Sequence, residues 1–111
     1  MGPSVFVVTY RDRSVAGGQE GATPSARAAG PDEIVLSAPA GQPCSDRAHH
    51  NQGRAAAVVV SFGQLGTPGQ DYLWRECWGR SYPMCRACWD RTRATAHMYR
   101  PGLTVTDLSG T

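Results

Sequence analysis

Short apolar runs alternate with segments rich in glycine, proline and polar residues along this chain of 111 residues. The apolar runs are dominated by β-branched and aromatic side chains, which favour strands with at least one buried face. They predict strands at residues 5–10, 32–37, 55–62 and 72–78, and an alternating segment predicts a closing strand at residues 103–107. The run Val58-Val59-Val60 is the strongest strand signal in the chain.

A single stretch, residues 85–99, has the spacing of an amphipathic helix. Positions three and four residues apart form an apolar stripe, which consists of Cys85, Cys88, Trp89, Thr92, Ala96 and Tyr99. A second, polar stripe at the same spacing consists of Arg86, Asp90, Arg93, His97 and Arg100. The helix is expected to end near Arg100, because Pro101 disfavours helical dihedral angles in the residue before it and Gly102 permits a reversal.

Together these elements predict a small α+β fold: a small antiparallel β-sheet with one main C-terminal helix. We expect a single domain over residues 1–111, because a chain of this length supports only one core. Residues 11–31 combine glycine, proline and alanine without periodicity, and they predict a flexible loop. Because only 41% of the residues are apolar, the core is thin, and cores of this size are commonly reinforced by a metal or by disulfides.

The four cysteines favour the metal. No segment approaches the roughly 20 apolar residues of a membrane span, and the N-terminal residues lack the basic stretch of a secretory signal. We therefore expect a cytoplasmic protein without membrane contact, in which cysteines stay reduced. Reduced cysteines in a short chain indicate metal ligation rather than disulfides. Zinc is the expected metal, so the fold should be zinc-stabilised.

Cys85 and Cys88 form a Cys-x-x-Cys pair at the start of the predicted helix. Two thiolates at this spacing can share one zinc ion, about 2.3 Å from each sulfur. A structural zinc ion needs four ligands, so two more must come from elsewhere in the chain. Cys44 is the expected third ligand.

The fourth ligand has two sources. Cys77 is favoured, because pairing of the strands at residues 55–62 and 71–78 would return it to the neighbourhood of the third cysteine. The alternative is a histidine, His49 or its neighbour His50, from the segment 41–53, which we expect to be a loop. We therefore predict a zinc site made by Cys44, Cys77, Cys85 and Cys88, with His49 as the alternative fourth ligand.

The order of these parts resembles the treble-clef class of zinc finger: a knuckle, a β-hairpin, and then a Cys-x-x-Cys pair at the start of a helix. The resemblance covers residues 43–100 and implies that this region is the zinc-binding core. The first knuckle of that class is a tight Cys-x-x-Cys, whereas the half-site that begins with Cys44 is longer. The resemblance therefore leaves the fourth ligand open.

All eleven basic residues are arginine, and the formal net charge is +2. This charge is too small to imply a nucleic-acid partner by itself. Six of the arginines lie between residues 75 and 100, among tryptophans and tyrosines, and such side chains serve both protein docking and nucleic-acid contact. Arginine without lysine also suggests a high-GC genome, such as that of an actinobacterium or one of its phages.

The favoured function is a non-enzymatic zinc-binding module that docks a protein partner, such as a regulatory or phage accessory protein. The docking face would be the polar helix stripe, with contacts from Arg86, Arg93, His97 and Arg100. One alternative is a transcriptional regulator that uses this face on nucleic acid. Another is a metal-dependent, nuclease-like enzyme using the His49-His50 loop, although its adjacent His-His-Asn differs from the separated His, Asn and His of such nucleases. The oligomeric state stays open.

Overall fold

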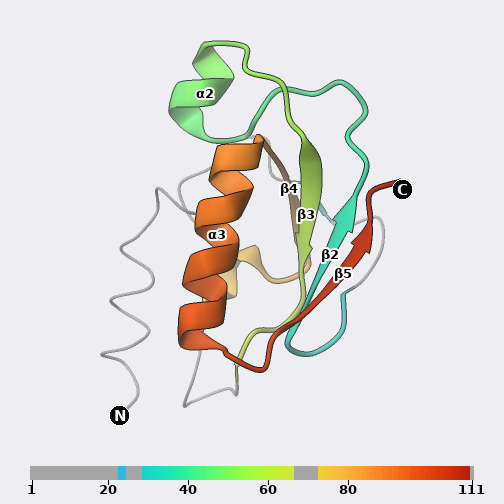
Figure 1. Ribbon diagram of the computed structural model, residues 1–111, viewed down its shortest axis with the longest axis vertical. Coiled ribbons are helices and arrows are strands. Elements are labelled where there is room, and N and C mark those ends of the chain that lie inside the picture. Colours follow the sequence, from blue (N-terminus) through green and yellow to red (C-terminus); the bar gives the residue numbers. More distant parts are fainter. Residues whose placement is uncertain (1–22, 25–28, 67–72, 111) are drawn as a thin grey trace.

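The computed structural model describes residues 23–24, 29–66 and 73–110 of the chain. In these ranges a five-stranded sheet has the strand order β1-β4-β3-β2-β5, and one long helix, α3, lies across one of its faces (Figure 1). The strands are β1 (Thr23–Pro24), β2 (Glu33–Ser37), β3 (Val58–Phe62), β4 (Arg80–Met84) and β5 (Thr104–Leu108). The helices are α2 (Arg47–Asn51), α3 (Arg86–Tyr99) and a short 3-10 helix, η1 (Arg75–Cys77).

The α+β class with one main helix is confirmed, but the sheet is mixed. Strands β1 to β4 pair antiparallel, as predicted. The prediction fails at β5, which lies parallel to β2 with Val105 opposite Ile34. Parallel neighbours need a crossover connection. The chain leaves β4, runs back along α3, and then enters β5 at the edge beyond β2 (Figure 1).

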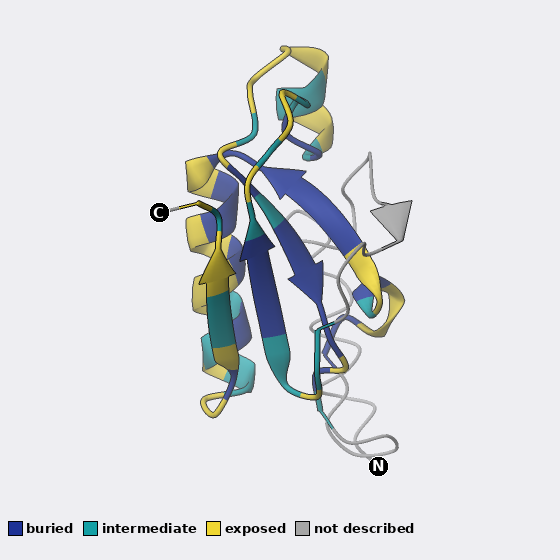
Figure 2. Cartoon of the chain, turned by 90° about the vertical axis from the view of Figure 1, so that its right-hand side faces the viewer, coloured by how far each residue is buried: buried dark blue, intermediate teal, exposed yellow. Residues whose placement is uncertain are grey.

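The face of the sheet beneath α3 forms the hydrophobic core. Its strand residues are Ile34, Leu36, Val58, Val60, Phe62, Tyr82 and Met84. The Phe62 ring makes edge-to-face contacts with Trp74, at 5.6 Å between ring centroids, and with Tyr82, at 5.5 Å. Trp89 of α3 packs into the same core, which holds the start of the helix against β3 and β4. Figure 2 shows that β2, β3 and most of β4 are buried, whereas β5 is more exposed.

Three of the predicted strands correspond to β2, β3 and β5, and the predicted helix corresponds to α3, with ends shifted by at most three residues. The strand predicted at residues 72–78 is wrong over its described part. Trp74 has a positive φ of 50°, and the next three residues form η1. The strand predicted at 5–10 lies outside the described residues. So does most of the loop predicted at 11–31, whose described part contains β1.

Asp32, just before β2, connects three loops at one end of the sheet. Its carboxylate accepts two hydrogen bonds from the Arg100 guanidinium, at 3.1 Å from Nε and 2.9 Å from Nη2, and one from the backbone N–H of Gly66 at 3.0 Å. The bonds from Arg100 are the main cause that holds the pKa of Asp32 below its ordinary value. Arg100, a predicted partner-binding residue, is thus engaged within the chain, and its side chain is only 24% exposed.

Replacing Asp32 with asparagine is expected to lower the free energy of unfolding near pH 7 by about 1–2 kcal/mol, the range for partly exposed hydrogen bonds to a charged group. Asparagine tolerates the positive φ of 51° found here. Because the folded-state pKa of Asp32 is lowered, its contribution is present above the unfolded pKa and is lost as the pH falls through the folded value. Urea titrations should therefore show that the free energies of unfolding of Asp32→Asn and of the original chain become equal in acid.

The matched control for this prediction is Asp90→Asn, which removes a carboxylate from the exposed side of α3. Surface changes of this kind alter the free energy of unfolding by about 0.5 kcal/mol or less. An equal loss of stability in the two variants, or a difference between Asp32→Asn and the original chain that persists in acid, would contradict the role given to Asp32.

Candidate metal centre

Four donor atoms from three segments converge at the N-terminal end of α3. Cys85 immediately precedes the helix and Cys88 lies in its first turn, while Cys44 comes from the loop before α2 and His49 from within α2. Figure 1 shows α2 beyond the N-terminal end of α3. The Sγ atoms of the three cysteines and a ring nitrogen of His49 lie within 4.8 Å of one another. This group could hold a metal ion.

The segment that carries Cys44 and His49 is fixed to the end of β4. The backbone N–H of Ser45 donates to the carbonyl oxygen of Pro83 in β4 at 2.7 Å, which places Cys44 beside the start of α3. Asp46 caps α2, and its carboxylate accepts the backbone N–H of His49 at 3.4 Å. We predicted a loop here, and the missed signal is Asp46, because aspartate is a preferred residue at helix N-termini.

The distances between the donor atoms match the edges of a tetrahedron around one metal ion. Zinc bonds of about 2.3 Å to sulfur and about 2.05 Å to nitrogen place two sulfurs roughly 3.8 Å apart, and a sulfur and a nitrogen roughly 3.6 Å apart. Nδ1 of His49 lies 3.2 Å from Sγ of Cys88, 3.5 Å from that of Cys85 and 3.8 Å from that of Cys44. The Sγ atoms of Cys44 and Cys88 are 3.7 Å apart. These distances are consistent with zinc.

The clustered thiols influence one another's ionisation. Burial, together with the neighbouring sulfurs of Cys85 and Cys44, raises the pKa of Cys88 to about 12. Burial also opposes ionisation of Cys85, but hydrogen bonds from the backbone and thiol of Cys88 outweigh it and lower the pKa of Cys85. One thiolate therefore forms more readily than the next. A bound divalent cation would favour ionisation of all three thiols, because thiols that coordinate a metal are deprotonated.

Two arginines lie next to the sulfurs, and no pattern in the sequence indicated this. Nη2 of Arg91 is 4.0 Å from Sγ of Cys88. The side chain of Arg54 is a further, smaller cause of the lowered pKa of Cys85, and the backbone carbonyl oxygen of Arg54 accepts the backbone N–H of Cys44 at 2.7 Å. Three thiolates and one neutral imidazole around Zn²⁺ carry a net charge of about −1. The two guanidinium groups offset that charge, as outer-shell partners of metal ligands commonly do.

The structure does not bring Cys77 to this group, and the prediction that it is the fourth ligand is corrected in favour of His49. Cys77 ends η1, which leads into the start of β4, whereas the other donors lie past the end of β4. The length of that strand therefore separates Cys77 from them. Its thiol is buried beside Tyr82, and burial raises its pKa to about 12. Cys77 behaves as a small core side chain.

The predicted partner-binding residues separate into two places. Arg86, Arg93 and His97 lie along one side of α3 and line a pocket that faces β5, whereas Arg100 is turned onto Asp32. His50, next to His49 in the sequence, is not a member of the donor group. Its Nδ1 atom is buried without a hydrogen-bond partner in the part of the chain that the structure describes.

No family model, curated protein or solved structure matches this chain. Among the described residues, none of the helices has the length and apolar character to cross a membrane. The order of parts is a Cys/His segment, the β3–β4 pair, and then a Cys-x-x-Cys pair at the start of α3. Fold and site together define a small α+β protein with a candidate metal centre of three cysteines and one histidine.

Proposed function

We propose that the chain is a zinc-binding module of treble-clef-like arrangement, in which one structural zinc ion ties the loop before α2 to the start of α3. The observation that carries this proposal is the convergence of Cys44, His49, Cys85 and Cys88 at the spacing of tetrahedral ligands. The donor types support zinc, because thiolate and imidazole suit it, whereas magnesium and calcium prefer oxygen ligands.

The number of donors supports a structural rather than a catalytic ion. Structural zinc sites are closed by four protein ligands, whereas catalytic sites keep one position open for water or substrate. The nuclease-like alternative needs His49 and His50 of α2 to act on a substrate. In the proposed centre His49 completes the ligand set instead, and three of the four donors are buried. We therefore favour a non-enzymatic function.

The proposed task of the module is to dock a protein partner through α3. Arg86 and Arg93 are exposed, and both pair with Asp90 only loosely, at 4.0 and 3.9 Å. Exposed pairs at such distances contribute little stability, so a carboxylate of a partner can replace Asp90. A net charge of +2 supports protein over nucleic acid, which binds through larger basic surfaces. The arginine-only composition favours a regulatory or phage accessory role in a high-GC genome.

Elemental analysis of the purified chain is expected to give one zinc ion per chain, because the four donors form one centre. Cobalt(II) added to the metal-free chain should give the absorption of a tetrahedral thiolate complex, since the same donors would hold it. Purified chain that binds neither metal, with its thiols reduced and available, would contradict the proposal.

A further inference from the structure

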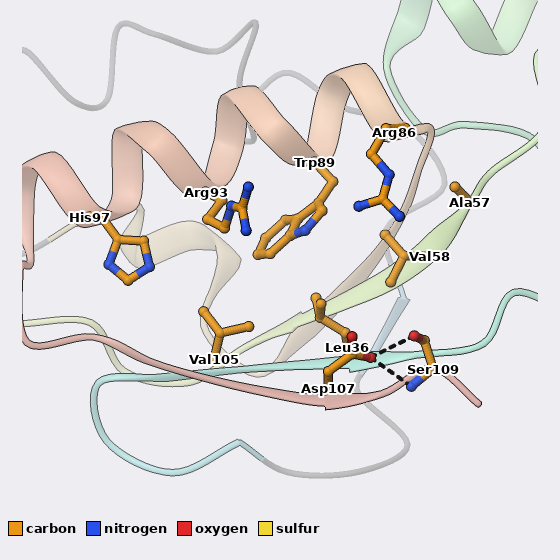
Figure 3. Close-up of a pocket in the computed structure, with 10 residues that line it drawn as sticks. All are labelled: Leu36, Ala57, Val58, Arg86, Trp89, Arg93, His97, Val105, Asp107 and Ser109. Carbon is orange, nitrogen blue, oxygen red and sulfur yellow. Dashed lines mark hydrogen bonds between the residues drawn. The ribbon is translucent and has the colours of Figure 1, made fainter. Parts of the chain in front are cut away.

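A pocket of about 240 Å³ opens between α3 and the β5 side of the sheet, apart from the candidate metal centre. Its apolar wall comes from the sheet, and the side chains of α3 point toward that wall (Figure 3). Its lining includes Leu36 of β2, Val105 and Asp107 of β5, and Arg86, Arg93 and His97 of α3.

Strand β5 borders the pocket, and its outer edge has no neighbouring strand among the described residues. The backbone N–H of Thr104 donates to the carbonyl oxygen of Asp32 on the β2 side, at 2.9 Å. Along a strand, the N–H and C=O groups of successive residues point alternately to the two sides. Val105 and Asp107 therefore direct their backbone N–H and C=O groups away from β2. The side chains of the same two residues lie on the side of the sheet that faces α3. Backbone groups that pair with no other described strand thus lie next to the pocket.

The charges along the pocket are unevenly placed. Arg86 lies toward the end of β5 that carries Asp107. Hydrogen bonds from the side chain and backbone of Ser109 are the main cause that lowers the pKa of Asp107, and the charge of Arg86 adds a smaller contribution. Arg93 and His97 lie toward the other end, over Val105 (Figure 3). Among the residues that line the pocket, Asp107 is the only carboxylate. The end at Arg93 therefore suits an acidic side chain, and the apolar wall suits an apolar one beside it.

We propose that this groove binds an extended acidic segment of a partner protein, which adds as a strand to the outer edge of β5. Its backbone pairs with the outward N–H and C=O groups of Val105 and Asp107. Alternate side chains of the segment enter the pocket, an acidic one beside Arg93 and an apolar one toward Leu36. This inference rests on the proposed docking function and specifies the partner, because unpaired strand edges favour addition of extended peptide.

The first test selects peptides from a displayed random library on the zinc-loaded chain. We expect enrichment of sequences with Asp or Glu two residues from a β-branched or other apolar residue. Affinity of a selected synthetic peptide should fall at least about tenfold with Arg93→Glu, which turns an attraction into a repulsion. The matched control is Arg80→Glu at the exposed start of β4, which changes the net charge equally and should leave affinity unchanged.

The second test separates strand addition from simple charge contact. Asp107→Pro removes an outward N–H that takes no part in the pairing with β2, and proline is tolerated at such edge positions. Its control, Asp107→Ala, loses the same carboxylate but keeps the N–H. We expect the proline chain to bind the selected peptide at least about tenfold more weakly than the alanine chain, with equal zinc content. In the unmodified chain, the peptide should slow hydrogen exchange of the Val105 and Asp107 amides.

The outcomes distinguish this inference from the proposed function beneath it. One outcome overturns strand addition but is compatible with docking through α3. In it, Arg93→Glu weakens peptide binding, Asp107→Pro and Asp107→Ala bind the peptide equally well, and the peptide does not protect the amides of β5. A library that yields no acidic peptide overturns the inference. So does tight, strongly salt-dependent binding of a single-stranded DNA oligonucleotide at the same arginines, which would also end the proposed protein docking. Zinc content is measured separately and is unaffected by each of these results.

Discussion

Replacing Cys88 with serine is expected to release the proposed zinc ion and to lower the thermal midpoint of the chain by about 16 °C or more. A structural zinc ion in small domains has an apparent binding free energy of about 10–16 kcal/mol, or roughly 2.5–4 kcal/mol for each of four ligands. Loss of one ligand therefore weakens binding about 100- to 1000-fold. Zinc held at 1000 times its dissociation constant stabilises a fold by about 4.1 kcal/mol, and each kcal/mol corresponds to roughly 4 °C in a domain of this size.

Cys88 is the most informative ligand to remove, because its sulfur lies within 3.7 Å of both the Cys44 sulfur and the His49 nitrogen. The matched control is Cys77→Ser, which makes the same exchange at a buried thiol outside the donor group. It should keep one zinc ion per chain, although a hydroxyl in the core costs some stability. Elemental analysis measures the zinc content of each variant, and calorimetry measures its thermal midpoint. Retention of zinc by Cys88→Ser, or its loss from Cys77→Ser, would contradict the ligand assignment.

The parts of the fold that were predictable have strong local signals. The valine run predicted β3, and the apolar and polar stripes predicted α3. Pro101 and Gly102 predicted the end of α3 near Arg100. The Cys-x-x-Cys pair at the helix start identified half of the donor group, because two thiols at this spacing cannot be far apart. Cys44 was also predicted. The structure brings these three thiols together.

The error over Cys77 arose from the alternation of aromatic and polar residues at 72–78, which is typical of a strand. The backbone turns there instead, at Trp74 and then through η1. The strand that pairs with β3 on the side away from β2 is β4, which contains Pro83, a residue that usually argues against a central strand. The ring nitrogen of Pro83 points away from β3. It lies on the same side as the carbonyl oxygen of Pro83, which accepts a hydrogen bond from the backbone N–H of Ser45. No ladder bond is lost there, so proline is tolerated.

The pocket and the parallel pairing of β5 could not be predicted from the sequence, because both depend on which strand β5 joins. The alternation at 103–107 indicates a strand but not its neighbour or direction. Once β5 lies beside β2, Val105 and Asp107 face α3, and three of the four predicted docking residues, Arg86, Arg93 and His97, border a groove. The exception is Arg100. It belongs to the polar stripe by spacing, but it follows the last turn of α3 and therefore reaches Asp32.

Replacing His49 with alanine is expected to weaken zinc binding roughly 100-fold or more, whereas His50→Ala should leave it almost unchanged. The two histidines are adjacent in α2, but only His49 places a ring nitrogen among the sulfurs. A chelating indicator that competes for zinc measures both affinities on the same scale. His50→Ala also removes a buried nitrogen without a described hydrogen-bond partner, so it should not lower the thermal midpoint through a lost bond. Equal weakening by both changes would contradict the assignment of His49.

A third variant separates the ligand from the helix that carries it. Asp46→Ala leaves every donor in place but removes the cap that fixes the backbone of His49. Outer support of this kind changes metal affinity by about 10- to 100-fold, so Asp46→Ala should fall between the two histidine variants. If the His49→Ala effect came only from loss of α2, Asp46→Ala would match it. The order His50→Ala, Asp46→Ala, His49→Ala, from weakest to strongest effect, therefore identifies the imidazole itself as the fourth ligand.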